Sequence, residues 1–260
     1  MAKTLRAIHP NAGLRRAYQK RLEDEVRRMA HSIEYWMKAA YRSREGEIAQ
    51  DASPARFLSE RLGQLIRYWT KRWDTFADTY ARWFAYRSEK TTDAALTSAM
   101  NAAGLTVKFT RSRLENDVVQ ALIAENVGLI KSIPAQYLQD VNGIVQRGVA
   151  AGRDISQITE ELTRRYAITR RRARLIARDQ TNKASEAIKR VRAKELGVTE
   201  AIWVHVPGVK TSRRTHQAMN GKRYVIAEGL YDSAVGRKVQ PAELVCCQCT
   251  CRYVVPEFGD

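Results

Sequence analysis

The feature that most constrains the fold is a pair of long runs in which apolar residues recur every three or four positions. The first run covers residues 14–40 and the second covers residues 58–84. This spacing places the apolar side chains on one face of an α-helix, so each run predicts a long amphipathic helix. Between the runs, Gly46 breaks the pattern and Ser53-Pro54 indicates a new start, because proline is tolerated in the first turn of a helix.

The tryptophans concentrate in these two runs, which hold Trp36, Trp69, Trp73 and Trp83, four of the five in the chain. Large aromatic rings at helical spacing usually fill a core, so we expect these side chains to pack between helices. A groove that receives a helix of a partner protein stays open as the alternative.

The rest of the sequence continues as helices and changes character after Gly197. Its expected elements are helices over 112–129, 135–150 and 156–166, a short strand or extended connector over 105–109, and strands over 201–206, 223–226 and 252–255. We expect Ile133-Pro134 to end or bend the chain between two helices, because proline restricts the residue before it and lacks an N–H. Thr169 is expected to cap a further helix.

These elements predict a mainly α fold with a small C-terminal β-containing module, an α+β class built on long amphipathic N-terminal helices. We divide the chain into an N-terminal helical region over 1–104, a helical region with an arginine-rich helix over 105–198, and a small β-containing Cys/His module over 199–260. We find no run of the roughly 20 apolar residues that span a bilayer and no apolar core of a secretion signal near the N-terminus. We therefore expect no membrane segment and synthesis in a cytosol.

Charge sets the class of partner. Lys and Arg number 45 against 28 Asp and Glu, which leaves a net charge of +17 and favours a polyanion through long-range attraction and counterion release. A dispersed positive surface that only maintains solubility is the alternative. The charge is clustered, however, because residues 164–194 hold twelve basic side chains and two acidic ones. Nucleic acid is therefore the first candidate.

The basic segment is expected to be a helix that meets double-stranded DNA without reading its sequence. The side chains that could line one face and contact phosphates are Arg171, Arg174, Arg178, Lys189 and Arg192. A solvated face, or one that binds an acidic protein, is the alternative. We find no helix-turn-helix, zinc-finger or RNA-binding signature that would indicate sequence-specific binding.

The four cysteines, at 246, 247, 249 and 251, lie within six residues. A disulfide framework would spread its cysteines, so a metal site or reduced thiols fit this pattern better. Imidazole and thiolate ligands suit zinc, and His216, Cys247, Cys249 and Cys251 could hold a structural zinc ion, although their spacing is not that of a standard zinc finger. Otherwise His216 caps a turn over small packed cysteines. The sequence requires no other cofactor.

Catalysis is the competing function. A cysteine could act as nucleophile with His216 or His205 as its base, and a nuclease could use His216 with carboxylates and a metal. Neither proposal is accompanied by a carboxylate pair, a nucleophile elbow or a phosphate-binding glycine loop. We therefore assign no catalytic residue and expect a protein that is not an enzyme, with a metal-dependent, nuclease-like DNA-processing enzyme as the alternative.

Several ordered blocks resemble the phage head morphogenesis family, the Mu F-like minor head proteins. The blocks are Glu125-Asn-Val-Gly-Leu-Ile-Lys-Ser-Ile-Pro134, Gly152-Arg-Asp-Ile155, Arg172-Ala-Arg-Leu-Ile-Ala-Arg-Asp-Gln-Thr-Asn-Lys183, Glu195-Leu-Gly-Val198 with Trp203, His216, Asn220-Gly-Lys222 and Cys249-Thr-Cys251-Arg252. The segment Ile8-His-Pro-Asn-Ala-Gly13 and the helix after it look like the start of such proteins. The sequence departs from the pattern at Val206-Pro-Gly-Val-Lys210, where many relatives carry an aspartate, and in the extra Cys246 and Cys247.

The resemblance implies that residues 105–260 together form the Mu F-like domain. It implies a protein present in few copies inside the virion head near the portal vertex, and in the host cytoplasm during assembly. The implied partners are the portal protein, the major capsid or scaffolding protein and double-stranded DNA, and the implied work is head morphogenesis with packaging, retention or delivery of DNA. A cellular nucleic-acid chaperone or a toxin-like module that shares the C-terminal domain is the remaining alternative.

Overall fold

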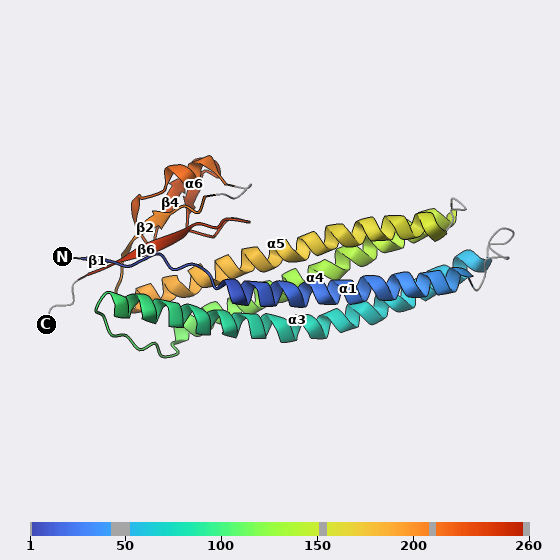
Figure 1. Ribbon diagram of the computed structural model, residues 1–260, viewed down its shortest axis with the longest axis horizontal. Coiled ribbons are helices and arrows are strands. Elements are labelled where there is room, and N and C mark those ends of the chain that lie inside the picture. The colour runs from blue at the N-terminus through green and yellow to red at the C-terminus, as the bar shows by residue number, and fades with distance from the viewer. Residues whose placement is uncertain (1, 43–52, 151–154, 208–211, 257–260) are drawn as a thin grey trace. The chain divides into compact units, whose positions relative to one another are not determined.

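The structure is a computed structural model that describes residues 2–42, 53–150, 155–207 and 212–256. Within these ranges it is mostly helical, with four long helices that Figure 1 shows in blue to orange. They are α1 (Ala12–Arg42), α3 (Ser53–Ala102), α4 (Arg113–Ala150) and α5 (Ile155–Glu195). A short helix, α6 (Arg214–Ala218), and small antiparallel strands follow near the C-terminus. The predicted mainly α fold with a C-terminal β-containing module is confirmed.

The chain divides into two compact units that are discontinuous in sequence. The first unit comprises Met1–Arg16, Arg82–Ala124 and Ala177–Asp260, and the second comprises Ala17–Ala81 and Glu125–Ile176. Each long helix contributes residues to both units. We call the first the sheet unit and the second the helical unit. The contiguous division at 104 and 198 stays a prediction.

In the helical unit, the periodic residues of the sequence form the core. Leu22, Val26 and Ile33 of α1 are completely buried, and Trp69 and Trp73 of α3 are buried with them. Trp36 is exposed, so the expectation that the tryptophans pack between helices does not hold for this ring. Figure 1 shows the portions of α1, α3, α4 and α5 that form this unit running side by side.

Two predicted breaks are wrong, because α4 and α5 are each one continuous helix. Pro134 lies inside α4, where it removes one backbone hydrogen bond, while Ile133 and Tyr137 on either side of it are buried. Thr169 lies inside α5, and its hydroxyl donates to the carbonyl of Arg165, 3.0 Å away, instead of capping a helix. Tertiary packing thus outweighs both local signals. Gly46 lies outside the described residues, and α3 begins at Ser53 as expected.

By length and composition, α4 is the one helix of the described residues that could cross a membrane. The core helix of a bundle passes the same test, and α4 packs in that manner. Its Ile130, Ile133 and Val141 are completely buried, and its Asn126 accepts a hydrogen bond from the Tyr18 hydroxyl at 2.9 Å.

In the sheet unit, the described residues form a four-stranded antiparallel sheet in the order β1-β6-β2-β3. Its strands are β1 (Lys3–Thr4), β2 (Glu200–Val204), β3 (Arg223–Val225) and β6 (Thr250–Val255). The separate pair β4 (Leu230–Asp232) and β5 (Arg237–Val239) forms a ribbon. The strands β2, β3 and β6 correspond to the three predicted ones, whereas β1, β4 and β5 were not predicted.

The core of the sheet unit joins the sheet to the ends of the long helices. Trp203 of β2 lies opposite Cys251 of β6 in the strand register and is completely buried. It shares a hydrophobic cluster with Tyr253, with Met100 of α3 and with Ala193 of α5. The segment 105–109 is an extended connector whose alternate residues pack against this cluster.

Candidate functional site

The predicted DNA-binding residues fall into an exposed group and a buried group. Arg171 and Arg174 lie in the helical unit and are exposed, and Arg171 forms no ion pair with any described residue. Arg174 pairs with Glu23 of α1, which also contacts Arg170 at 3.4 Å. Burial alone would raise the pKa of the Glu23 carboxyl, but the hydrogen bonds from Arg174 and Gln19 outweigh it, so the pKa is lowered.

Arg178 is the first residue of the basic series that lies in the sheet unit. Its side chain is half-buried, and its Nε has no hydrogen-bond partner among the described residues. The guanidinium group is therefore less available to a phosphate than that of Arg171.

Lys189 is inside the protein, so its predicted contact with DNA is corrected. Its ammonium group donates to the Ile8 carbonyl at 2.7 Å, to Glu186 Oε1 at 2.5 Å and to Thr250 Oγ1 at 2.8 Å. An ammonium group has three protons to donate, so these bonds satisfy it completely. The side chain is 0% exposed and holds the N-terminal segment, α5 and β6 together.

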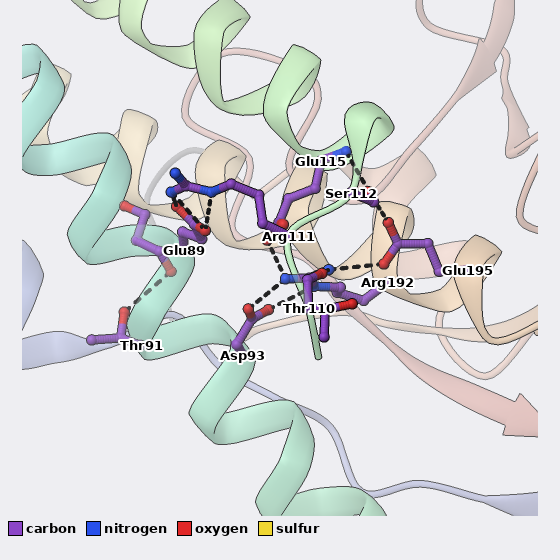
Figure 2. Close-up of polar contacts among 10 residues, drawn as sticks. Glu89, Thr91, Asp93, Thr110, Arg111, Ser112, Glu115, Arg192 and Glu195 are labelled. Atoms are coloured by element: carbon purple, nitrogen blue, oxygen red, sulfur yellow. Dashed lines mark hydrogen bonds and ion pairs between the residues drawn. The ribbon is translucent and has the colours of Figure 1, made fainter. Parts of the chain in front are cut away.

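Arg192 is likewise inside the protein, and its predicted DNA contact is also corrected. Figure 2 shows its guanidinium group between Asp93, Glu195 and the Thr110 carbonyl. It donates to both oxygens of Asp93, at 2.9 and 2.7 Å, and also pairs with the buried Glu115. Burial disfavours the charged arginine, but Asp93 and Glu195 outweigh this cost and raise its pKa. Arg192 therefore links α3, α4 and α5 with Thr110, the residue that follows the connector.

The second candidate is a buried cluster of one imidazole and two thiols in the sheet unit. His216 comes from α6, and Cys247 and Cys249 come from the segment before β6. The His216 Nδ1 atom lies 3.4 Å from the Cys247 sulfur and 3.6 Å from the Cys249 sulfur. On the other side of the ring, Nε2 lies 3.0 Å from Asp232 Oδ2. The cluster could hold a metal ion.

The segment that carries the two thiols is held from α5. The backbone N–H of Cys246 donates to Asp179 Oδ1 at 2.6 Å, and the Asn182 side chain donates to the Cys247 carbonyl at 3.2 Å. Cys246 has a φ of 61°, in the left-handed region that is strained for a residue other than glycine. The two α5 side chains thus fix the strained bend that turns Cys247 toward His216.

Cys251 does not join the cluster, which corrects its predicted place as a fourth metal ligand. Its sulfur lies 3.9 Å from Glu186 Oε2 of α5. Burial raises the pKa of this thiol to about 11, so it stays protonated. The reason is the strand register, which sets Cys251 opposite Trp203 within the sheet, whereas Cys247 and Cys249 precede β6.

The electrostatics of the cluster favour one thiolate. The hydrogen bond from Cys249 and then that from His216 lower the pKa of Cys247, against the effect of burial. The contact with Cys247 raises the pKa of His216 despite desolvation, and Asp232 acts in the same direction. These contacts favour a thiolate at Cys247 and a protonated thiol at Cys249, whose pKa is raised by its contact with Cys247.

The same contacts could describe a cysteine nucleophile with a histidine base and an aspartate that orients it. Burial argues against that interpretation, because Cys247, His216 and Asp232 are 4%, 2% and 0% exposed. A substrate carbonyl or phosphate must reach the nucleophile, but Cys247 is buried. The ring of Trp203 also packs edge-on against His216, with 5.3 Å between the two ring centroids. The geometry suits a metal ligand set better than a catalytic centre.

Comparison with known proteins shows which family part of the chain resembles. Residues 139–252 match the family described as Phage Mu protein F like protein, a stretch that contains the whole of α5 and the His-Cys cluster. A protein of Haemophilus influenzae that is described as uncharacterized is 26% identical over 191 residues. The alignment covers 72% of this chain but 42% of that relative, so the chain spans less than half of the relative's length. No solved structure matches the chain significantly.

Proposed function

We propose, from the Phage Mu protein F-like domain that residues 139–252 form, that this chain is a minor head protein that acts at the portal vertex during head morphogenesis. Proteins of this family are structural components of phage heads and are generally not enzymes. The proposed partners are the portal protein and the major capsid or scaffolding protein. In this proposal the chain positions other head components and does not catalyse the cleavage of covalent bonds.

We further propose that the chain contacts packaged DNA through the arginines of α5 that face solvent in the helical unit. The observation that carries this step is the exposure of Arg171 in a run of basic residues, next to Arg170 and Arg174. Each guanidinium group can hold a phosphate in a forked geometry. The pairs of Arg170 and Arg174 with Glu23 lie at the surface, so their exchange for a phosphate costs about 1 kcal/mol or less.

The net charge of +17 supports the same proposal, because sequence-independent binding arises from counterion release. Lys189 and Arg192 are excluded from the DNA contact by their burial, so the proposed set is smaller than the full basic series. Contacts to phosphates position a protein on DNA without reading its bases. Such binding suits packaging, retention or delivery of any phage genome.

A gel-shift titration over a salt series tests the DNA contact. We expect binding to unrelated duplexes with equal affinity, and a slope of log K against log salt of about −0.9 for each phosphate contacted. Arg171→Glu combined with Arg174→Glu should weaken binding and reduce the slope. The matched control is Arg56→Glu combined with Arg67→Glu, which reverses two exposed arginines of α3.

Either of two results would overturn this part of the proposal. One is the absence of binding at low salt. The other is an equal loss of affinity for the control and the double variant, which would assign binding to net charge alone.

A further inference from the structure

We propose that His205, His216, Cys247 and Cys249 form a tetrahedral Zn²⁺ site that fixes the C-terminal sheet unit, with Asp232 and Ser212 orienting the two imidazoles. The site goes beyond the proposed head function, because it requires neither DNA nor a portal. It differs from the ligand set expected from the sequence by the exchange of Cys251 for His205.

The distances between donor atoms match those of a zinc tetrahedron. With Zn–S bonds of about 2.3 Å and Zn–N bonds of about 2.0–2.1 Å, a sulfur and a nitrogen on one tetrahedron are about 3.6 Å apart. The His216 Nδ1 atom lies 3.4 and 3.6 Å from the two sulfurs, and the His205 Nδ1 atom lies 3.6 Å from the Cys249 sulfur. Three of the sulfur–nitrogen edges of the site therefore already have the required length.

Both imidazoles present the same nitrogen to the thiols and have a partner on the other one. His216 Nε2 contacts Asp232 Oδ2 at 3.0 Å, and His205 Nε2 contacts Ser212 Oγ at 3.1 Å. A histidine that binds zinc usually donates its free N–H to a carboxylate, a backbone carbonyl or water, which fixes its tautomer, and a serine hydroxyl oxygen can accept in the same way. Asp232 is itself fixed, because its other oxygen accepts a hydrogen bond from the backbone of Ala234 at 2.9 Å.

The fold holds His205 where a fourth ligand is needed. It follows the last residue of β2, and its backbone N–H donates to the Asn220 side chain at 2.9 Å. The His205 ring is half-buried, and its Nδ1 atom contacts the Cys249 sulfur of the cluster. The ligand atoms of His216, Cys247 and Cys249 already lie within 4.8 Å of one another, and a movement of the His205 ring past Cys249 toward them would complete the tetrahedron.

The charges of the site also fit a divalent cation. Two thiolates neutralise Zn²⁺, and two neutral imidazoles complete the coordination without adding charge. A buried thiolate without such a partner carries a large desolvation cost, which the cation would offset. The ligands come from the end of β2, from α6 and from the segment before β6, so the metal would tie together three parts of the sheet unit.

The test is a metal analysis of the full-length chain. The protein is loaded with Zn²⁺ alone, dialysed against metal-free buffer and analysed by elemental mass spectrometry. We expect one zinc ion per chain, retained in Cys246→Ser, Cys251→Ser and His31→Ala. We expect Cys249→Ser and His205→Ala to lose it, and Asp232→Asn to bind roughly 10–100-fold more weakly, as is usual when a group behind a ligand is removed.

Replacement of Zn²⁺ by Co²⁺ gives a readout that is independent of stability. A tetrahedral site with two thiolates produces visible ligand-field and sulfur-to-cobalt charge-transfer bands, whereas an octahedral surface site does not. Circular dichroism of each variant separates lost ligands from lost folding. A zinc content near zero in the wild-type protein would overturn the proposal. Metal loss in Cys251→Ser with full binding in His205→Ala would also overturn it.

Discussion

Removal of the Arg192 guanidinium group should destabilise the protein more than removal of any exposed arginine of α5. In Arg192→Met, the carboxylates of Glu115, Asp93 and Glu195 lose their shared cation, and Glu115 is completely buried. Loss of one partner from a buried ion pair costs roughly 3–5 kcal/mol. In Arg174→Met, the lost pair with Glu23 is exposed, and the expected cost is about 1 kcal/mol or less.

Urea unfolding followed by circular dichroism measures the difference. With a slope near 3 kcal/mol per M, the loss for Arg192→Met corresponds to a midpoint shift of roughly 1–2 M. Addition of Glu115→Gln should recover part of the loss, because the buried carboxylate that lacks its partner is removed. Equal midpoints for Arg192→Met and Arg174→Met, together with weakened DNA binding by folded Arg192→Met, would refute the assignment of Arg192 to the interior.

Three further predictions concern the helical unit and the metal site. Glu23→Gln should strengthen DNA binding a few-fold in a gel shift at fixed salt, because it frees Arg170 and Arg174. The pKa of Glu23 is lowered in the fold, so its carboxylate adds a small stabilisation above the ordinary carboxyl pKa that is lost as the pH falls below that pKa. Glu23→Gln should remove this stabilisation. Trp73→Ala should cost roughly 3–5 kcal/mol in urea unfolding because the ring is buried, whereas exposed Trp36→Ala should cost about 1 kcal/mol or less. Chelation of zinc-loaded protein should lower its Tm, and an unchanged Tm would show that the metal does not stabilise the fold.

The sequence predicts the helices well where hydrophobic periodicity agrees with packing. The runs at 14–40 and 58–84 became α1 and α3 because their apolar faces could be buried together. The breaks predicted at Pro134 and Thr169 were wrong, because the free energy that these residues cost locally is smaller than the free energy gained by packing the long helices that contain them. The two-residue strand β1 carries too few residues for a pattern to be recognised.

For the candidate sites too, the sequence pattern predicted which residues cluster, whereas only the tertiary structure shows which of them are buried. Residues 178 and 189 are eleven apart, about three helical turns, so periodicity places Lys189 on the same face as Arg178. Only the fold shows that Lys189 and Arg192 lie beneath the N-terminal segment, β6 and the ends of α3 and α4. The arginine cluster was therefore recognised from the sequence, but its extent was not.

For the metal site, the clustered cysteines and His216 gave a usable signal, and the structure unites three of the four expected ligands. Cys251 was included because it is close in sequence, although the register of β6 directs it toward Glu186. His205 was considered only as a catalytic base. A single histidine at the end of a strand, with no second ligand residue at a recognisable short separation, does not indicate a metal site. Asp179 and Asn182 had no assigned role, and they hold the cysteine segment.

The most direct test of the head-protein account is quantitative mass spectrometry of purified, DNA-filled heads after chemical cross-linking. The account predicts that the chain is present in a few copies per particle and is cross-linked to the portal protein. It also predicts that a peptide containing Arg171 is recovered cross-linked to DNA. Heads that assemble, package DNA and contain none of the chain would contradict it.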